Sequence, residues 1–275
     1  TPFLVELAAA AMAAGTGLPS FRYFACGGAA VPPDLIPAAD AAFANCRSFR
    51  VFGASEVPLV SFGWPRDKGL AATSDGEVVD YSVRIVDAED RDLPPGKEGE
   101  ILARGPGMML GYADAAQTAE AITADGYFRT GDLGILDGNG AITITGRKKD
   151  LIIRGGENIS AKEIEDLLHM HPDVSEACVV AIPHDRLGDG GARAQPFLDE
   201  TDRGGDRLGE GVCAYIVARD GALGADELSA HVAGSGLARQ KIPERFEFVA
   251  ELPRTASGKV RKDVLRDRIR AALSA

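Results

Sequence analysis

The chain has 275 residues, 45% of them hydrophobic and 26% charged, which is typical of a soluble globular protein with one large or two medium domains. Asp and Glu number 41 against 30 Lys and Arg, so the formal net charge is −11. An acidic chain without a basic stripe excludes nucleic acid as an expected partner, and any phosphate site must be built from local groups.

The four cysteines are scattered and form no CxxC pair. This pattern favours reduced thiols in a cytoplasmic protein over a disulfide framework or a zinc site. The sequence has no signal-peptide pattern and no apolar run approaching the ~18 residues of a membrane span, so stable membrane insertion is not expected. The chain starts at Thr1 directly in an apolar helical pattern, which we interpret as a piece of a longer protein.

Residues 1–74 alternate between helical and extended patterns. The run at 21–28 is typical of a buried strand ending in glycines, 32–45 of a helix with Pro near its start, and 48–56 of a second strand ending in a turn. This order predicts part of a mostly parallel α/β sheet, in which ligands lie at the carboxyl ends of the strands.

Residues 75–146 have a different pattern. Short apolar runs at 78–87, 98–105 and 141–146 are separated by PPG, DG and DGNG turns. This spacing predicts an antiparallel β-rich subdomain. We expect a hinge at 147–150, where the β region ends.

Residues 151–275 predict a separate small α+β domain. Ser160 and Glu163 form a capping box that predicts a helix start. A hairpin strand, two further strands and two further helices are expected at 151–156, 176–183, 211–220, 225–234 and 260–275.

A glycine-rich, charged segment at about 187–206 lies between two copies of Asp-Arg-Leu-Gly, at 185–188 and 206–209. We interpret it as an exposed loop inserted between two strands. A functional lid is the alternative interpretation.

The first candidate site is the FGASE run that follows the strand at 48–56. Ser55 can donate to a phosphate oxygen, Glu56 can hold Mg²⁺, and Phe52 offers a flat face to a base. Gly53 supplies the turn. Taken alone, such a run is more often a plain turn.

Two further glycine runs carry candidate groups. Gly27-Gly28-Ala29 ends a strand and permits a planar ligand to come close. Asp132 follows a glycine and can accept both hydroxyls of a ribose, with an Asx turn as the alternative.

Cations follow in two places. Arg147 can contact a ribose or phosphate, and Lys149 is suited to a hinge. Lys259 follows a glycine in a polar loop and can neutralise phosphate charge as it develops. A solvated surface is the alternative for each. His169 and His171 do not share a helix face, and we interpret them as helix-end residues and not as metal ligands.

Several motifs in order resemble the acyl-adenylate-forming superfamily, which includes acyl-CoA synthetases, luciferase and peptide-synthetase adenylation domains. They are FGASE, GEILARGPGMMLGY, GYFRTGDLG, GRKKDLIIRGGENISAKEIE and PRTASGKVRK. The resemblance covers essentially the whole chain apart from the insert. It implies the C-terminal part of a large α/β adenylation domain with a small β subdomain, followed by a small mobile α+β domain.

The resemblance also implies roles for individual residues. Ser55 would contact the α-phosphate, Glu56 would hold Mg²⁺, Lys149 would be the hinge, and Lys259 would be the catalytic lysine of the first half-reaction. The remaining cofactor-binding positions would form the adenine pocket, the ribose site and the coenzyme A tunnel: Gly27, Gly28, Ala29, Phe52, Gly53, Asp132, Arg147, Gly155 and Gly156.

The implied reaction consumes ATP, a small-molecule carboxylic acid and coenzyme A. The acid first attacks the α-phosphorus of MgATP, which gives an acyl-adenylate and pyrophosphate. The small domain then turns about Lys149, and the thiol of coenzyme A displaces AMP. The wording of the first motifs is most similar to ligases for medium-chain or cyclic acids, and a homodimer would form through the large domain.

Phe52 and Ser55 replace the family's usual Tyr and Thr, and the family's Ser/Thr/Gly-rich phosphate loop is not found in the chain. The chain alone is therefore expected to be inactive. Two alternatives stay open: a peptide-synthetase adenylation domain, and a truncated, non-catalytic AMP-binding module.

Overall fold

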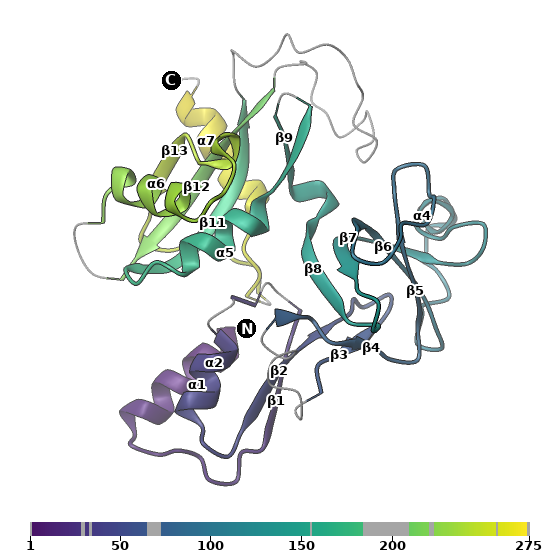
Figure 1. Cartoon of the computed structure of the whole chain (residues 1–275), viewed down its shortest axis with the longest axis horizontal. Helices are drawn as coiled ribbons and strands as arrows, with labels where there is room; N and C mark the ends of the chain where they lie inside the picture. Colours follow the sequence, from purple (N-terminus) through teal and green to yellow (C-terminus); the bar gives the residue numbers. More distant parts are fainter. Residues whose placement is uncertain are drawn as a thin grey trace. The chain divides into compact units, whose positions relative to one another are not determined.

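A computed structural model describes residues 2–28, 31–32, 35–64, 73–154, 156–183, 209–219, 223–256 and 258–273. The chain divides into two compact units, Thr1–Thr145 and Gly146–Ala275. Figure 1 shows the elements of both units along the chain. Among the described residues, no helix combines the length and apolar character that crossing a membrane requires. Ala29, Gly155 and the insert at 187–206 lie outside the described residues.

The first unit begins with two helices and a four-stranded sheet in the order β1-β2-β3-β4. Their bounds are α1 Pro2–Ala13, β1 Tyr23–Cys26, α2 Leu35–Ala42, β2 Arg47–Phe52, β3 Ser61–Phe62 and β4 Glu77–Val78. The α/β character predicted for this region is confirmed. Parallel pairing holds for β1 and β2, whereas β2–β3 and β3–β4 pair antiparallel. The expectation of a mostly parallel sheet is therefore wrong for the described strands, because the link from β2 to β3 is too short for a crossover.

A second four-stranded sheet, in the order β5-β6-β7-β8, follows, and the last two residues of β8 belong to the second unit. Its bounds are β5 Ser82–Val86, β6 Glu98–Arg104, β7 Phe128–Leu136 and β8 Ile142–Arg147, with α4 Ala115–Ala121 between β6 and β7. The antiparallel pairing expected from the turns is confirmed for β5–β6 and β6–β7. Asp132 lies inside β7.

In its described residues, the second unit contains a hairpin, a three-stranded sheet and three α-helices. The bounds are β9 Leu151–Arg154, β10 Glu157–Ser160, α5 Ala161–His169, β11 Val174–Pro183, β12 Glu210–Ala218, α6 Ala225–Gly234, β13 Arg245–Phe248 and α7 Lys262–Leu273. Strand β12 is central, antiparallel to β11 and parallel to β13. Short 3₁₀ turns cover Lys148–Asp150 and Arg239–Lys241. The Ser160 hydroxyl accepts from the amide of Glu163 at 3.4 Å, so the predicted helix start is confirmed.

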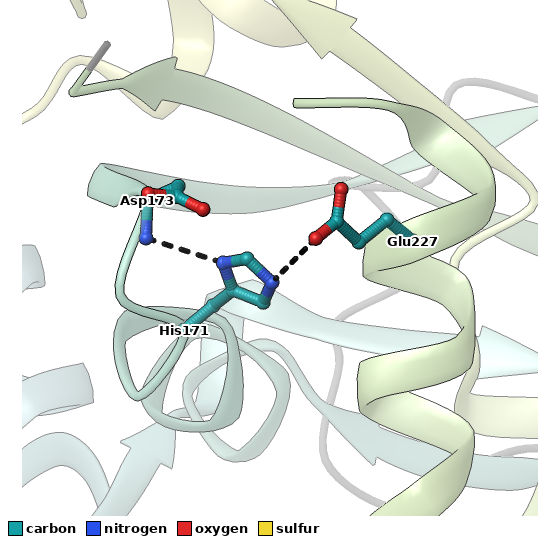
Figure 2. A group of neighbouring side chains, drawn as sticks. All are labelled: His171, Asp173 and Glu227. Carbon is teal, nitrogen blue, oxygen red and sulfur yellow. Dashed lines mark hydrogen bonds and ion pairs between the residues drawn. The ribbon is translucent and has the colours of Figure 1, made fainter. Parts of the chain in front are cut away.

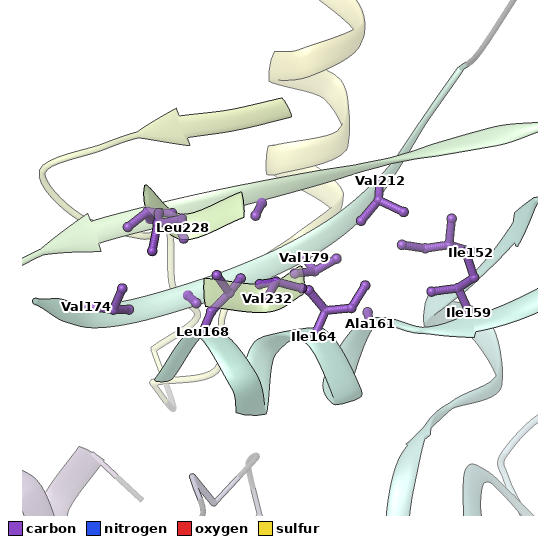
Figure 3. Close-up of a cluster of buried hydrophobic side chains, with 13 residues drawn as sticks. Ile152, Ile159, Ala161, Ile164, Leu168, Val174, Val179, Val212, Leu228 and Val232 are labelled. Atoms are coloured by element: carbon purple, nitrogen blue, oxygen red, sulfur yellow. The ribbon is translucent and has the colours of Figure 1, made fainter. Parts of the chain in front are cut away.

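The sheet of the second unit is buried on both faces. Successive strand side chains point to opposite faces, and β11 places Ala177 and Val179 in one cluster and Cys178 and Val180 in another. The first cluster includes Ile164 and Leu168 of α5 with Leu228 and Val232 of α6, as Figure 3 shows. The second includes Leu265 and Ile269 of α7. The three helices therefore cover the sheet from two sides, which holds α7 firmly in the unit.

Candidate functional site

A closed turn follows β2 and carries two of the predicted site residues at its tip. The amide of Ala54 donates to the carbonyl of Val57 at 3.1 Å, and the amide of Val57 donates back to Ala54 at 3.2 Å. Ser55 is exposed and Glu56 is half-buried between these two bonds. The turn therefore presents a hydroxyl and a carboxylate side by side at a strand end, as predicted.

Gly27 directly follows β1 and lies close to the backbone of Val51 in β2. A Cβ at Gly27 would lie 2.5 Å from the carbonyl oxygen of Val51, which real side chains do not tolerate. The glycine is therefore required by strand packing, in addition to any role in admitting a ligand. Gly28 follows at the end of the same strand, and Gly53 follows β2.

Phe52 lies mostly in the core of the first unit. Its side chain is 8% exposed and belongs to a hydrophobic cluster with Val57, Val60 and Ile101. Only a small part of the ring can meet a base. Its stacking on adenine stays a prediction.

Tyr112 is a site residue to which sequence reasoning assigned no role. Its hydroxyl donates to Glu56 Oε1 at 2.9 Å, and the amide of Met109 donates to the carbonyl of Glu56 at 2.8 Å. Burial of the phenol, followed by its bond to Glu56, raises the pKa of Tyr112 above its ordinary value. The sequence feature that could have indicated a role for Tyr112 was its position at the end of the GEILARGPGMMLGY motif.

Glu56 has the chemistry expected of a magnesium ligand. Mg²⁺ in nucleotide sites is usually held by one or two carboxylates together with substrate phosphates. Glu56 supplies one half-buried carboxylate on a turn beside a hydroxyl, and Tyr112 orients it. The residues present fit the ion.

A bulge in β7 holds Asp132. Glu100 pairs with Leu133 and Leu102 pairs with Arg129, so Ile101 alone faces the three residues 130–132. Gly131 has φ +67°, a left-handed conformation that glycine adopts without strain. Thr130 Oγ1 donates to the carbonyl of Ile101 at 2.8 Å and accepts from the amide of Asp132 at 3.1 Å. The bulge therefore fixes a buried carboxylate, 6% exposed, at this point of the sheet.

Several of the predicted site residues in the first unit are joined through its hydrophobic core. Ile101, which anchors the bulge, belongs to the same hydrophobic cluster as Phe52 at the end of β2. Phe52, the turn that carries Glu56 and the Asp132 bulge are therefore linked through one packed core. Arg147 is exposed and lies in the second unit, so its predicted pairing with Asp132 on a ribose stays a prediction.

The second unit contains the remaining predicted residues. Lys149 is exposed within the 3₁₀ turn Lys148–Asp150 that precedes β9. Gly156 is exposed in the turn between Arg154 and Glu157, which pair across the β9–β10 hairpin. Both positions are accessible, as a hinge and a tunnel-lining turn require.

Lys259 lies on a closed loop ahead of α7. The amide of Thr255 donates to the carbonyl of Lys259 at 2.8 Å, and the amide of Lys259 donates to Thr255 Oγ1 at 3.1 Å. Arg254 donates to the carbonyl of Gly258 at 2.7 Å. The backbone is therefore held while the Lys259 side chain is exposed.

His171 lies beyond α5 and is grouped with Asp173 and Glu227, as Figure 2 shows. The amide of Asp173 donates to Nδ1 at 3.3 Å, and Nε2 lies 3.6 Å from Glu227 Oε1. Because Nδ1 accepts, the ring proton is assigned to Nε2, toward the carboxylate. The three residues offer atoms within 4.8 Å of one another. Both ring nitrogens already have protein partners, which favours a structural role joining α5 to α6.

Two family models match the chain. The AMP-binding enzyme model matches residues 1–113, and the AMP-binding enzyme C-terminal domain model matches residues 204–259. Together they span more than half of the chain. The chain belongs to the AMP-binding enzyme family. This confirms the resemblance on which the expected fold rested.

Relatives of the chain support its assignment to the AMP-binding enzyme family. It is 35% identical to the medium-chain fatty-acid–CoA ligase of Escherichia coli, over 100% of the chain and 45% of that protein. It is 40% identical to the indoleacetate–CoA ligase of Aromatoleum aromaticum, over 79% of the chain and 39% of that protein. The chain thus spans less than half the length of these relatives.

A solved structure has the same fold. The amide bond synthetase McbA from Marinactinospora thermotolerans matches with a TM-score of 0.81 and 30% identity, covering 98% of this chain and 51% of that one. The mixed α/β and α+β fold of the two units is therefore that of an AMP-binding enzyme.

Proposed function

We propose that the chain supplies the C-terminal part of an ATP-dependent carboxylic acid–CoA ligase. The observation that carries the proposal is identity of 35% along the entire chain with a protein named as a medium-chain fatty-acid–CoA ligase. The proposed substrates are ATP, coenzyme A and a medium-chain or cyclic carboxylic acid.

In the first half-reaction, an oxygen of the carboxylate attacks the α-phosphorus of ATP and pyrophosphate leaves. Ser55 would bind the α-phosphate, and Glu56 would hold Mg²⁺, which would neutralise phosphate charge. The exposed ammonium of Lys259, on its closed loop, stabilises the negative charge that develops. Asp132 accepts from the ribose hydroxyls, for which a buried carboxylate on a fixed bulge is well suited.

In the second half-reaction, the thiol of coenzyme A attacks the acyl carbon, and AMP leaves with the electron pair of the broken C–O bond. We propose that torsion changes at Lys149 turn the second unit between the two steps. Gly156, exposed on the β9–β10 turn, then admits the pantetheine arm.

An amine acceptor is the second candidate for the last step. The solved structure with a TM-score of 0.81 is named an amide bond synthetase. An amine in place of the thiol would give an amide and AMP from the same acyl-adenylate. Adenylation for a peptide synthetase stays a separate alternative, because its acceptor is also a thiol.

The location and assembly of the protein are further parts of the proposal. Cys46, Cys178 and Cys213 are buried free thiols, which agrees with a reducing compartment and with the cytoplasmic supply of ATP and coenzyme A. A homodimer through the large domain stays a prediction.

The test uses a hybrid ligase, in which residues 1–275 replace the segment they match in the Escherichia coli medium-chain ligase. We expect it to catalyse ATP–pyrophosphate exchange with a panel of carboxylic acids and to release AMP with coenzyme A. Amide formation without thioester would favour the second candidate. The 275-residue chain alone should release negligible pyrophosphate, because it lacks the family's phosphate loop. An inactive but well-folded hybrid would overturn the proposed function.

A further inference from the structure

The second unit contains an ionic network that joins three segments far apart in the sequence. Arg266 of α7 donates to Asp150 Oδ1 at 2.7 Å. Lys262, the first residue of α7, lies 2.8 Å from Glu165 Oε1 on α5 and 3.9 Å from Asp150 Oδ2. We define these four side chains as the α7 clamp. Asp150 directly follows Lys149, so the clamp reaches the proposed hinge.

The clamp is largely withdrawn from water and balanced in charge. The exposed fractions of its side chains are 13% for Asp150, 11% for Glu165, 19% for Lys262 and 24% for Arg266. Two carboxylates face two cations. Burial opposes the charge of Lys262, but the carboxylates of Glu165 and Asp150 outweigh it and raise the pKa of the ammonium. The group therefore stays charged and paired at neutral pH.

Side chains of the clamp also form hydrogen bonds with the backbone groups of Lys149 and Val179. Arg266 donates to the carbonyl of Lys149 at 3.3 Å. Lys262 donates to the carbonyl of Val179 at 3.2 Å, and Glu165 Oε1 accepts from the amide of Val179 at 2.7 Å. These hydrogen bonds attach β11, the strand against which α5 packs, to the α7 clamp.

The position of the Lys149 carbonyl determines where rotation can occur. That oxygen belongs to the peptide group joining Lys149 to Asp150, and a peptide group is planar and rigid. Both soft torsions of Lys149 precede this group in the chain. If α7 holds the peptide group, rotation at Lys149 turns α7 and everything attached to it as one body.

Lys259 is attached to that body. It precedes Lys262 by three residues, and the amide of Arg261 donates to the carbonyl of Pro253 at 2.8 Å, which closes the base of its loop. The clamp therefore links the C-terminal edge of the hinge to the loop that carries the proposed catalytic lysine.

We propose that Arg266 and Lys262 are positioning residues, which hold the Lys149–Asp150 peptide group to α7 and so define the C-terminal edge of the hinge. The catalytic consequence rests on the proposed function, whereas the clamp itself does not. Arg266 acts through the hinge and not by touching substrate.

The first experiment measures the clamp without catalysis. Amide hydrogen exchange at 150–154 is compared in the 275-residue chain and in its Arg266→Gln and Arg268→Gln variants. Arg268 is exposed on the same helix and serves as the matched control. We expect exchange in Arg266→Gln to quicken about tenfold at these amides, with Arg268→Gln unchanged. Equal exchange in all three proteins would overturn the proposal.

Two conservative variants keep the proposal testable if Arg266→Gln does not fold. Asp150→Asn removes one charge with little change of shape and should quicken exchange in the same segment. Arg266→Lys retains the charge and should restore part of the protection. Unchanged exchange in Asp150→Asn would also overturn the proposal.

The second experiment measures the two half-reactions in the hybrid ligase. Arg266→Gln should change the ratio of pyrophosphate exchange to thioester formation from supplied acyl-adenylate by about threefold or more. An equal loss of both would indicate a merely structural role and overturn positioning. An unmutated hybrid without exchange activity would instead overturn the proposed function and leave the hydrogen-exchange result intact.

Discussion

The hydroxyl of Tyr112 lies 2.9 Å from Glu56 Oε1 and donates a hydrogen bond to it. This bond joins the turn after β2 to the GPGMMLGY segment, 56 residues away. It fixes the orientation of the one carboxylate for which a magnesium role is proposed.

Tyr112→Phe should weaken the magnesium dependence of the hybrid ligase without unfolding it. Loss of one hydrogen bond to a charged group costs about 1.5–3 kcal/mol, so the Mg²⁺ concentration for half-maximal pyrophosphate exchange should rise about tenfold or more. Tyr23→Phe, at a 65% exposed tyrosine, is the control. Unchanged magnesium dependence would contradict the role of Tyr112.

The same bond predicts a titration. Because the pKa of Tyr112 is raised above 10.0 by burial and by Glu56, the folded protein holds the phenolic proton more tightly than the unfolded chain. The resulting stability is fully present below pH 10.0 and is lost as the pH rises through the folded-state pKa. Glu56→Gln should lower this pKa, measured as phenolate absorbance against Tyr112→Phe. A pKa that does not move in Glu56→Gln would show that burial alone raises it.

Thr130→Val should destabilise the bulge that holds Asp132. The change removes the donor to the Ile101 carbonyl and the acceptor for the Asp132 amide, and each buried group left unpaired costs about 1–3 kcal/mol. We expect a lower free energy of unfolding in urea and weaker AMP binding by the hybrid. Thr143→Val on β8 should change neither quantity. Normal AMP binding by a destabilised Thr130→Val protein would argue against a ribose role for Asp132.

Lys259→Ala should slow adenylation and spare the second step. Its side chain is exposed, so folding should not change. Removing one electrostatic group from a transition state costs about 100-fold or more in rate, and we expect a loss of that size in pyrophosphate exchange. Thioester formation from supplied acyl-adenylate should stay within about threefold. Lys97→Ala is the control, and equal losses in both half-reactions would refute the assigned role.

Glu165→Gln should destabilise the second unit because it leaves Lys262 short of a partner. Breaking a largely buried ion pair costs about 3 kcal/mol. Asp267→Asn, which removes a partner of the exposed Arg270 on α7, should cost about 0.5 kcal/mol. Urea unfolding of the chain measures both, and similar losses would contradict the buried character of the clamp.

The pH dependence of this pair has a definite sign. The pKa of Lys262 is raised in the folded state above its ordinary 10.5. Its contribution is therefore fully present below pH 10.5 and declines as the pH rises further. The stability difference between the unmutated chain and Glu165→Gln should be constant near neutral pH.

Local signals predicted most of the second unit. The Ser160–Glu163 capping box marked the start of α5, and the apolar runs at 176–183 and 211–220 marked β11 and β12. Capping and side-chain alternation act over a few residues, so the sequence displays them directly. The family motifs are likewise recognisable from the sequence alone.

Strand β7 could not be predicted in the same way. Thr130, Gly131 and Asp132 have the composition of a turn, and they lie in a strand because β6 pairs on both sides of the bulge. The pairing depends on residues some thirty positions away, where Thr130 finds the Ile101 carbonyl. The parallel strand β13 was not predicted for a similar reason, because it pairs with β12, a strand that is not its immediate neighbour in sequence.

The sequence by itself determined the family, most helices and strands of the second unit, and the candidate residues for which nucleotide, metal and phosphate roles are proposed. Only the tertiary structure decided that Tyr112 binds Glu56, that Asp132 lies on a bulge, and that α7 clamps the residue after Lys149. The physical reason is the separation along the chain over which each kind of interaction acts. Propensity and capping are local, whereas burial of paired charges arises only when segments about a hundred residues apart, such as Glu165 and Lys262, are packed together.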